Sequence, residues 1–143
     1  MKIKIKYEFI NDIVEFLYHL TLNGKQSRHR SRLVKTLQEK WKQIAEEEME
    51  LLKEFAGVDE EGNPKTKDDG KSFDIDDIKG FTQQRKELFD EHFILEGGEA
   101  SGYLRTVKEF LFSYDETVSG KTAEIYDYLC VAFENSNQEE EQE

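Results

Sequence analysis

This sequence has one cysteine, one proline and no long apolar run. The single cysteine, Cys130, excludes an internal disulfide framework and favours a reducing compartment, so we expect a cytoplasmic protein. No run of about 18 apolar residues occurs, and the first residues alternate lysine with apolar side chains. The sequence therefore predicts neither a membrane span nor a signal peptide, and no membrane partner.

What the sequence does contain is charge and aromatic bulk. Hydrophobic and charged residues each make up 36% of the chain, so the core must be small. Ten Phe and six Tyr supply large side chains for that core, which argues against full disorder. A chain of 143 residues fits one domain. We expect this domain to span residues 1–135 and a solvated acidic tail to follow at residues 136–143.

The charges are distributed unevenly along the chain. The formal net charge is −12, but residues 23–43 hold seven Lys and Arg against Glu39 alone. Their net charge is therefore +6, whereas residues 44–143 carry −18. This polarity disfavours direct binding of nucleic acid, because the acidic majority of the chain would repel a polyanion.

Two periodic patterns predict the first secondary-structure elements. In MKIKIKY, Ile3 and Ile5 alternate with lysines, which is typical of a short strand with one buried face. From residue 8 to residue 22 apolar residues recur at helical spacing, and Asn23-Gly24 supplies a stop. The longest predicted helix follows, from about residue 27 to residue 55. Its apolar stripe has heptad-like steps of three and four: Val34, Leu37, Trp41, Ile44, Leu51 and Phe55.

One position in the stripe of the long helix is a carboxylate. Glu48 stands where the alternation of three and four residues predicts an apolar side chain. Either Glu48 leans out to water beside a stripe widened by Ala45 and Leu52, or it is a buried acid paired with a base. Both interpretations stay open.

The second half of the chain predicts shorter elements. Residues 57–75 concentrate Gly, Asp, Asn and the only proline, which indicates a loop or small hairpin ending in a short strand, SFDI. HFIL is a candidate strand before a flexible EGGEASG, and further helices are predicted at residues 103–114 and 122–133. Asp76-Asp77 begin another helix, since acids are favoured in a first turn. Its inward residues are Ile78, Phe81, Leu88 and Phe89.

The fold class that follows is α+β and mainly helical. We expect four to five helices and a small sheet of two or three strands. The N-terminal strand belongs to this sheet, and SFDI and HFIL are its candidate partners.

The sequence predicts no catalytic, cofactor or metal site. SGKT, at residues 119–122, resembles the end of a phosphate-binding loop, but Asp115 stands where such a loop requires glycine, so we expect a turn and a capped helix. Neither possible EF-hand frame of the acidic loop begins with an oxygen ligand. Cys130 lacks a catalytic signature, and the histidines, His19, His29 and His92, are scattered. The sequence therefore favours a protein that is not an enzyme, with a dispersed active site as the minor alternative.

The basic segment KQSRHRSRLVK, residues 25–35, needs an explanation in so acidic a chain. Arg28, Arg32 and Lys35 would lie one turn apart on a helix, where they could pair with acids of the same chain or of a second copy. We expect the segment to be such an internal or intersubunit counter-charge. Docking on an acidic partner and contact with nucleic acid are the remaining interpretations. The predicted contact residues are Lys25, Arg28, Arg30, Arg32 and Lys35.

Six segments also carry a resemblance: MKIKIKYEF, FLYHLTLNGKQSRHRSRLVKTL, EFAGVDEEGNP, FDIDDIKGF, ELFDEHFIL and SGKTAEIYDYLC. In these segments the chain resembles a family of small uncharacterised proteins encoded by phages and prophages of Gram-positive bacteria. The likeness covers nearly the whole chain, but the segments are fold-like patterns and not active-site motifs. It implies the cytoplasm of an infected bacterium as the setting, and it assigns no residue role.

Two hypotheses of function fit that setting. The first is an acidic binding protein that inhibits host nucleic-acid-handling or defence machinery, because clustered carboxylates can present charge to a basic nucleic-acid groove. The alternative is a structural or assembly protein of the phage that self-associates through the long helix. The partner is then a host or phage protein, or a second copy of the chain. The predicted partner-binding acids are Glu46, Glu47, Glu50, Asp74, Asp76, Asp77, Glu87, Asp90 and Glu91.

Overall fold

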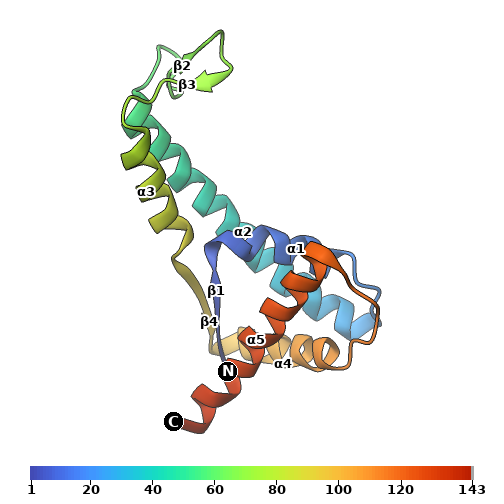
Figure 1. Cartoon of the computed structure of the whole chain (residues 1–143). Coiled ribbons are helices and arrows are strands. Elements are labelled where there is room, and N and C mark those ends of the chain that lie inside the picture. Colours follow the sequence, from blue (N-terminus) through green and yellow to red (C-terminus); the bar gives the residue numbers. More distant parts are fainter. Residues whose placement is uncertain (143) are drawn as a thin grey trace.

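The long helix predicted from the heptad-like stripe organises the fold. This helix, α2 (Gly24–Ala56), has 33 residues and is therefore about 50 Å long. Its first half packs in a body with α1 (Ile10–Tyr18) and α4 (Gly98–Phe112). Its second half leaves the body and pairs with α3 (Ile78–Phe89) in a projecting arm (Figure 1).

The structure is a computed structural model that describes residues 1–142, with side chains through residue 136. These residues form five α-helices, one short 3₁₀ helix and two antiparallel sheets of two strands each. The predicted fold class, α+β and mainly helical, is confirmed. Within this described part, no helix is both long enough and apolar enough to cross a membrane.

The N-terminal strand has the buried face that its alternation predicts. β1 (Lys2–Lys6) pairs antiparallel with β4 (His92–Glu96), so HFIL is a strand. Ile3 and Ile5 are at most 1% exposed, and Ile3 lies opposite Leu95 in the register.

SFDI does not join that sheet, so this expectation was wrong. β3 (Ser72–Phe73) pairs with β2 (Thr66–Lys67) in a separate hairpin at the end of the arm (Figure 1). The reason is distance, since residues 57–75 follow the outer end of α2 and lie far from β1. Of the two structures predicted for these residues, a loop or a hairpin, the hairpin is present. Val58 also forms an isolated β-bridge with Pro64.

The first helix is shorter than predicted. It follows a 3₁₀ turn at Tyr7–Phe9 and runs only over Ile10–Tyr18 as α1. Asn23, expected to mark its end, instead caps the start of α2, because its side-chain oxygen accepts a hydrogen bond from the backbone N–H of Gln26 at 3.1 Å. Asparagine is favoured at a helix N-cap because this bond satisfies one of the free N–H groups of the first turn.

The last two helices are longer than predicted. The flexible segment expected at EGGEASG is instead the start of α4, where Gly97 and Gly98 have positive φ angles of 68° and 52°. Glycine adopts this conformation without steric cost. α5 (Gly120–Gln142) continues through most of the predicted acidic tail, and Ser136 on it is buried. Residue 143 and the side chains of residues 137–143 lie outside the described part.

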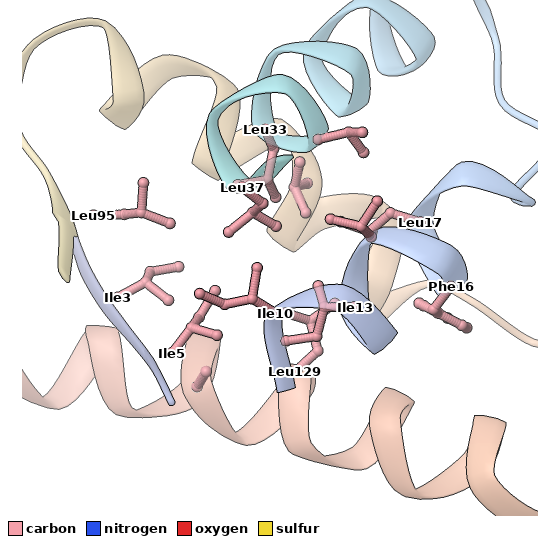
Figure 2. Close-up of a cluster of buried hydrophobic side chains, with 14 of the residues drawn as sticks. Ile3, Ile5, Ile10, Ile13, Phe16, Leu17, Leu33, Leu37, Leu95 and Leu129 are labelled. Atoms are coloured by element: carbon pink, nitrogen blue, oxygen red, sulfur yellow. The ribbon is translucent and has the colours of Figure 1, made fainter. Parts of the chain in front are cut away.

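The body has one hydrophobic core, in which side chains of the strand pair, α1, α2 and α5 point toward one another (Figure 2). Tyr128 fastens α5 to the strand, because its hydroxyl accepts a hydrogen bond from the backbone N–H of Lys6 at 2.9 Å. The largest fully buried side chains are Ile3, Ile5, Ile10, Ile13, Leu17, Leu33, Leu37, Ile44, Leu104, Leu111, Leu129 and Phe133.

A second, smaller cluster holds the arm together. Its members are Leu52, Ala56 and Ile75, which are buried, with Phe55 and Phe81 packed against them. Along α3, which is described throughout, no residue is fully buried, because this helix packs mainly on α2 and makes fewer contacts with the 3₁₀ turn. Ile78, expected to face inward, is 62% exposed and corrects that prediction. It is the first residue of α3, ahead of the turns that meet α2.

Candidate functional site

The arm concentrates negative charge. Residues 46–91 form the end of α2, the hairpin and α3, and they carry sixteen carboxylates against seven Lys and Arg, a net charge of −9. All nine acids predicted to bind a partner lie in this segment. They share one projecting element, but they do not share one surface.

Three of these acids line a groove between α2 and α3. The groove has a volume of about 470 Å³, and its lining residues are Glu47, Leu51, Gln84, Glu87, Leu88 and Glu91. Glu47 lies one turn before Leu51 on α2, so the two share one side of that helix, and Leu88 of α3 lines the groove together with Glu87 and Glu91. The two leucines are half-buried, whereas the three glutamates are exposed. Among the described residues, Glu47 and Glu91 form no ion pair, so the groove presents free carboxylates beside apolar surface.

Glu48 lies outside this groove. Its surroundings combine features of the two interpretations of this residue, a side chain at the surface and an acid paired with a base. Its carboxylate accepts a hydrogen bond from Arg85 Nε at 2.8 Å, and the side chain is 29% exposed. Arg85 also lies over the ring of Phe89, at 4.5 Å from its centroid. Glu48 is therefore paired with a base, but at the surface, where such pairs add little stability.

Two of the predicted acids have structural partners. The carboxylate of Asp77 accepts a hydrogen bond from the backbone N–H of Gly80 at 2.9 Å and so caps α3. Asp90 pairs with Lys86 at 2.9 Å and with Lys6 at 3.0 Å. Hydrogen bonds from Lys86 and then Lys6 hold the pKa of the Asp90 carboxyl below its usual value. Asp90 therefore joins the base of the arm to β1.

The remaining predicted acids are exposed and lie outside the groove. Asp74 and Asp76 connect the hairpin to α3, while Glu46 and Glu50 lie on the long helix. Glu50 is 3.6 Å from Lys53. The structure thus brings together Glu47, Glu87 and Glu91, and it separates them from these four.

Arg30, in the basic segment, has a structural role that no sequence signal indicated. Its Nη1 donates hydrogen bonds to the carbonyl oxygens of Leu17 at 2.7 Å and Leu20 at 2.8 Å. A helix leaves its last carbonyls without partners, so the guanidinium satisfies groups at and beyond the end of α1 and ties them to α2.

The other cations predicted as contacts face solvent: Lys25, Arg28, Arg32 and Lys35. Among the described residues, none of them forms an ion pair with a carboxylate. His29 is partly buried, and its Nδ1 lies 2.7 Å from Thr106 Oγ1 on α4. Burial first, and then the charges of Arg32, Lys25 and Arg28, lower the pKa of His29. Within the described part of the chain, the predicted internal counter-charge therefore does not take the form of an ion pair with these four cations.

A second cavity, which the sequence did not predict, lies between α1 and the start of α5. It measures about 290 Å³, and its lining combines apolar side chains such as Phe16 with charged ones. In this lining Glu15 lies 3.8 Å from His19, and Lys121 of the SGKT segment lies 3.8 Å from Asp12. Glu15 and His19 are four residues apart in sequence, which places both on the same side of α1. No group of three or more His, Cys, Asp and Glu among the described side chains is arranged to hold a metal ion.

Cys130 and Tyr126 have packing roles. Burial raises the pKa of the Cys130 thiol, which opposes formation of a nucleophilic thiolate. Burial also raises the pKa of Tyr126 to about 12. The Tyr126 hydroxyl donates a hydrogen bond to the carbonyl oxygen of Leu111 at 2.8 Å and so joins α5 to α4.

Comparison with known proteins does not assign the chain to a family. No protein-family model, curated protein or solved structure matches the chain. The resemblance to small phage and prophage proteins therefore stays a prediction, and function has to be argued from the surfaces themselves.

Proposed function

We propose that the chain is a non-enzymatic binding protein of phage or prophage origin that inhibits a host protein of nucleic-acid handling or defence through its acidic arm. The observation that carries this proposal is the groove between α2 and α3, in which Glu47, Glu87 and Glu91 flank two leucines on an element of net charge −9. A protein that binds nucleic acid by its phosphates presents the opposite pattern, with Lys and Arg along a cleft. The arm therefore complements such a cleft in charge.

The form of the arm suits this kind of partner. It projects from the body as a narrow pair of helices with a hairpin at its end (Figure 1), so it can enter a cleft that the body cannot. Its charge accelerates encounter with a cationic surface, an effect that salt weakens. Leu51 and Leu88 add apolar contact that a phosphate backbone lacks. Binding of the arm should therefore depend less on salt than binding of the nucleic acid it displaces.

Two matched variants test the role of the groove. The first changes Glu47, Glu87 and Glu91 to Gln, which removes three charges and keeps the side-chain shape. The control changes Glu60, Glu61 and Glu116 to Gln; these are equally exposed acids outside the groove. Both variants change the net charge by the same amount, so any difference between them belongs to the groove and not to total charge.

The experiment is affinity capture from a nuclease-treated lysate of a Gram-positive bacterium, followed by a titration. Wild type and control should retain a nucleic-acid-binding protein that the groove variant loses. The purified partner should then release fluorescent DNA when wild-type chain is added, as measured by anisotropy. Equal capture by the groove variant, recovery of the bait alone, or a partner that keeps its DNA would each overturn the proposal.

A further inference from the structure

The charges along α2 run against its helix dipole. Acids are stabilising near the N-terminus of a helix and bases near its C-terminus. In α2, residues 24–42 carry seven Lys and Arg against one acid, whereas residues 43–56 carry five acids against one lysine. This order does not stabilise the helix by itself, so the separation of charge needs another explanation.

Both charges lie on one exposed face of the helix. At 100° per residue, Arg28, Arg32 and Lys35 project within about 60° of one another, and Glu46 and Glu50 project into the same sector. All five side chains are exposed, and the buried residues of α2 lie on the opposite side. This face, defined by these five residues, is called the outer face of α2. It is basic in the body and acidic in the arm.

The spacing of the two charged groups makes the outer face self-complementary. The cations centre near residue 32 and the acids near residue 48, which places them about 25 Å apart along the axis. When two copies of α2 lie side by side and antiparallel, with a two-fold axis near residue 40, each basic half faces an acidic half. Glu39 then lies opposite Lys42 of the second copy, which adds a pair at the axis.

We propose that the outer face of α2 docks on the same face of a second copy of this chain to form an antiparallel, two-fold dimer. Arg28, Arg32 and Lys35 of one protomer pair with Glu46 and Glu50 of the other, and the reverse. A two-fold interface requires one patch that complements itself, and the outer face meets this requirement in charge. The antiparallel helix dipoles also favour the arrangement.

The surface beside the outer face leaves room for a second copy. Two shallow grooves flank the basic half, one of about 570 Å³ toward α4, with Glu99 and Tyr103, and one of about 500 Å³ toward α1, with Tyr18. Met49, 41% exposed, adds an apolar contact in the acidic half. Each copy carries −12, but charges more than about 8 Å apart are largely screened at physiological ionic strength. The attraction between facing charges of the two copies therefore outweighs the repulsion between their net charges, and the dimer weakens as salt rises.

A charge swap tests the pairing. One variant carries Arg28→Glu and Arg32→Glu, and the other carries Glu46→Arg and Glu50→Arg. Each alone places like charges opposite each other and should sediment as a monomer. An equal mixture restores opposite charges at both contacts and should form a heterodimer. Sedimentation velocity at about 0.05 M and about 0.5 M salt measures this, with circular dichroism to show that each variant is folded.

Controls separate this proposal from the function proposed above, on which it does not rest. Lys67→Glu with Lys71→Glu, and Glu60→Arg with Glu61→Arg, change the net charge equally on the hairpin and should leave the dimer intact. The Gln variant of the groove should also remain dimeric, whether or not it captures a partner. A wild type that is monomeric at every concentration, a folded mixture that stays monomeric, or a dimer that both reversals leave unchanged would overturn the proposal.

Discussion

Removal of the Arg30 side chain should destabilise the body, whereas removal of Arg32, one half-turn further along α2, should not. Arg30 donates to two carbonyl oxygens at 2.7 and 2.8 Å. A hydrogen bond to a charged group contributes about 1.5–3 kcal/mol, and water can reach part of this site after truncation. We therefore expect Arg30→Ala to lose roughly 2 kcal/mol in total. Arg32 is exposed, so Arg32→Ala should stay within about 0.5 kcal/mol of wild type.

Urea unfolding followed by circular dichroism measures both changes by linear extrapolation. For a chain of this size, 2 kcal/mol corresponds to a fall in Tm of roughly 4–8 °C. Arg30→Lys should give an intermediate loss, because an ammonium keeps the charge but lacks the planar fork of donors. Equal losses for the two alanine variants would refute the reasoning, since charge removal alone would then account for the effect.

Three further results follow from the structure. Leu129→Ala, at a fully buried position, should cost about 2–5 kcal/mol of unfolding free energy, and a loss no larger than that of exposed Val131→Ala would contradict the packing. Asn23→Ala should cost about 1 kcal/mol by removing the cap of α2, and Asn23→Asp should restore most of it. Tyr126, with a pKa of about 12, should give an ionisation step near pH 12 in an absorbance titration, and Tyr126→Phe should abolish that step. Because this folded-state pKa lies above the unfolded value, its contribution to stability is complete below about pH 10 and is lost as pH rises through 12.

The spacing of apolar residues correctly predicted those elements in which one face is buried and the opposite face is exposed. The alternation of Ile3 and Ile5 places β1 correctly because one face of that strand lies on the core. The stripe of α2 likewise predicts a helix of nearly the right length. The same logic failed at Ile78, since an apolar residue on a helix is buried only where a second element covers it, and α3 packs mainly on α2.

The candidate site depends on tertiary contacts that sequence spacing does not reveal. Glu47 and Glu87 lie 40 residues apart in sequence and share a groove only because the hairpin returns α3 along α2. Arg30 resembled its basic neighbours in sequence, yet it alone meets the carbonyl oxygens at the end of α1, because the short connection into α2 brings them within reach. Composition therefore located the charged segments correctly, while the fold decided which of their members are free.

The separate cluster of the arm makes α2 a helix shared by two cooperative units. Leu52, Ala56 and Ile75 form a set that has no member in common with the core of the body. Opening the outer end of the arm breaks this small set and leaves the core of the body intact, so it costs less free energy than global unfolding. Amide hydrogen exchange should therefore show a step inside one continuous helix, slow near Leu37 and faster beyond Leu52. The outer turns of α2 can then unwind and adapt to the contour of a partner while the inner turns remain folded.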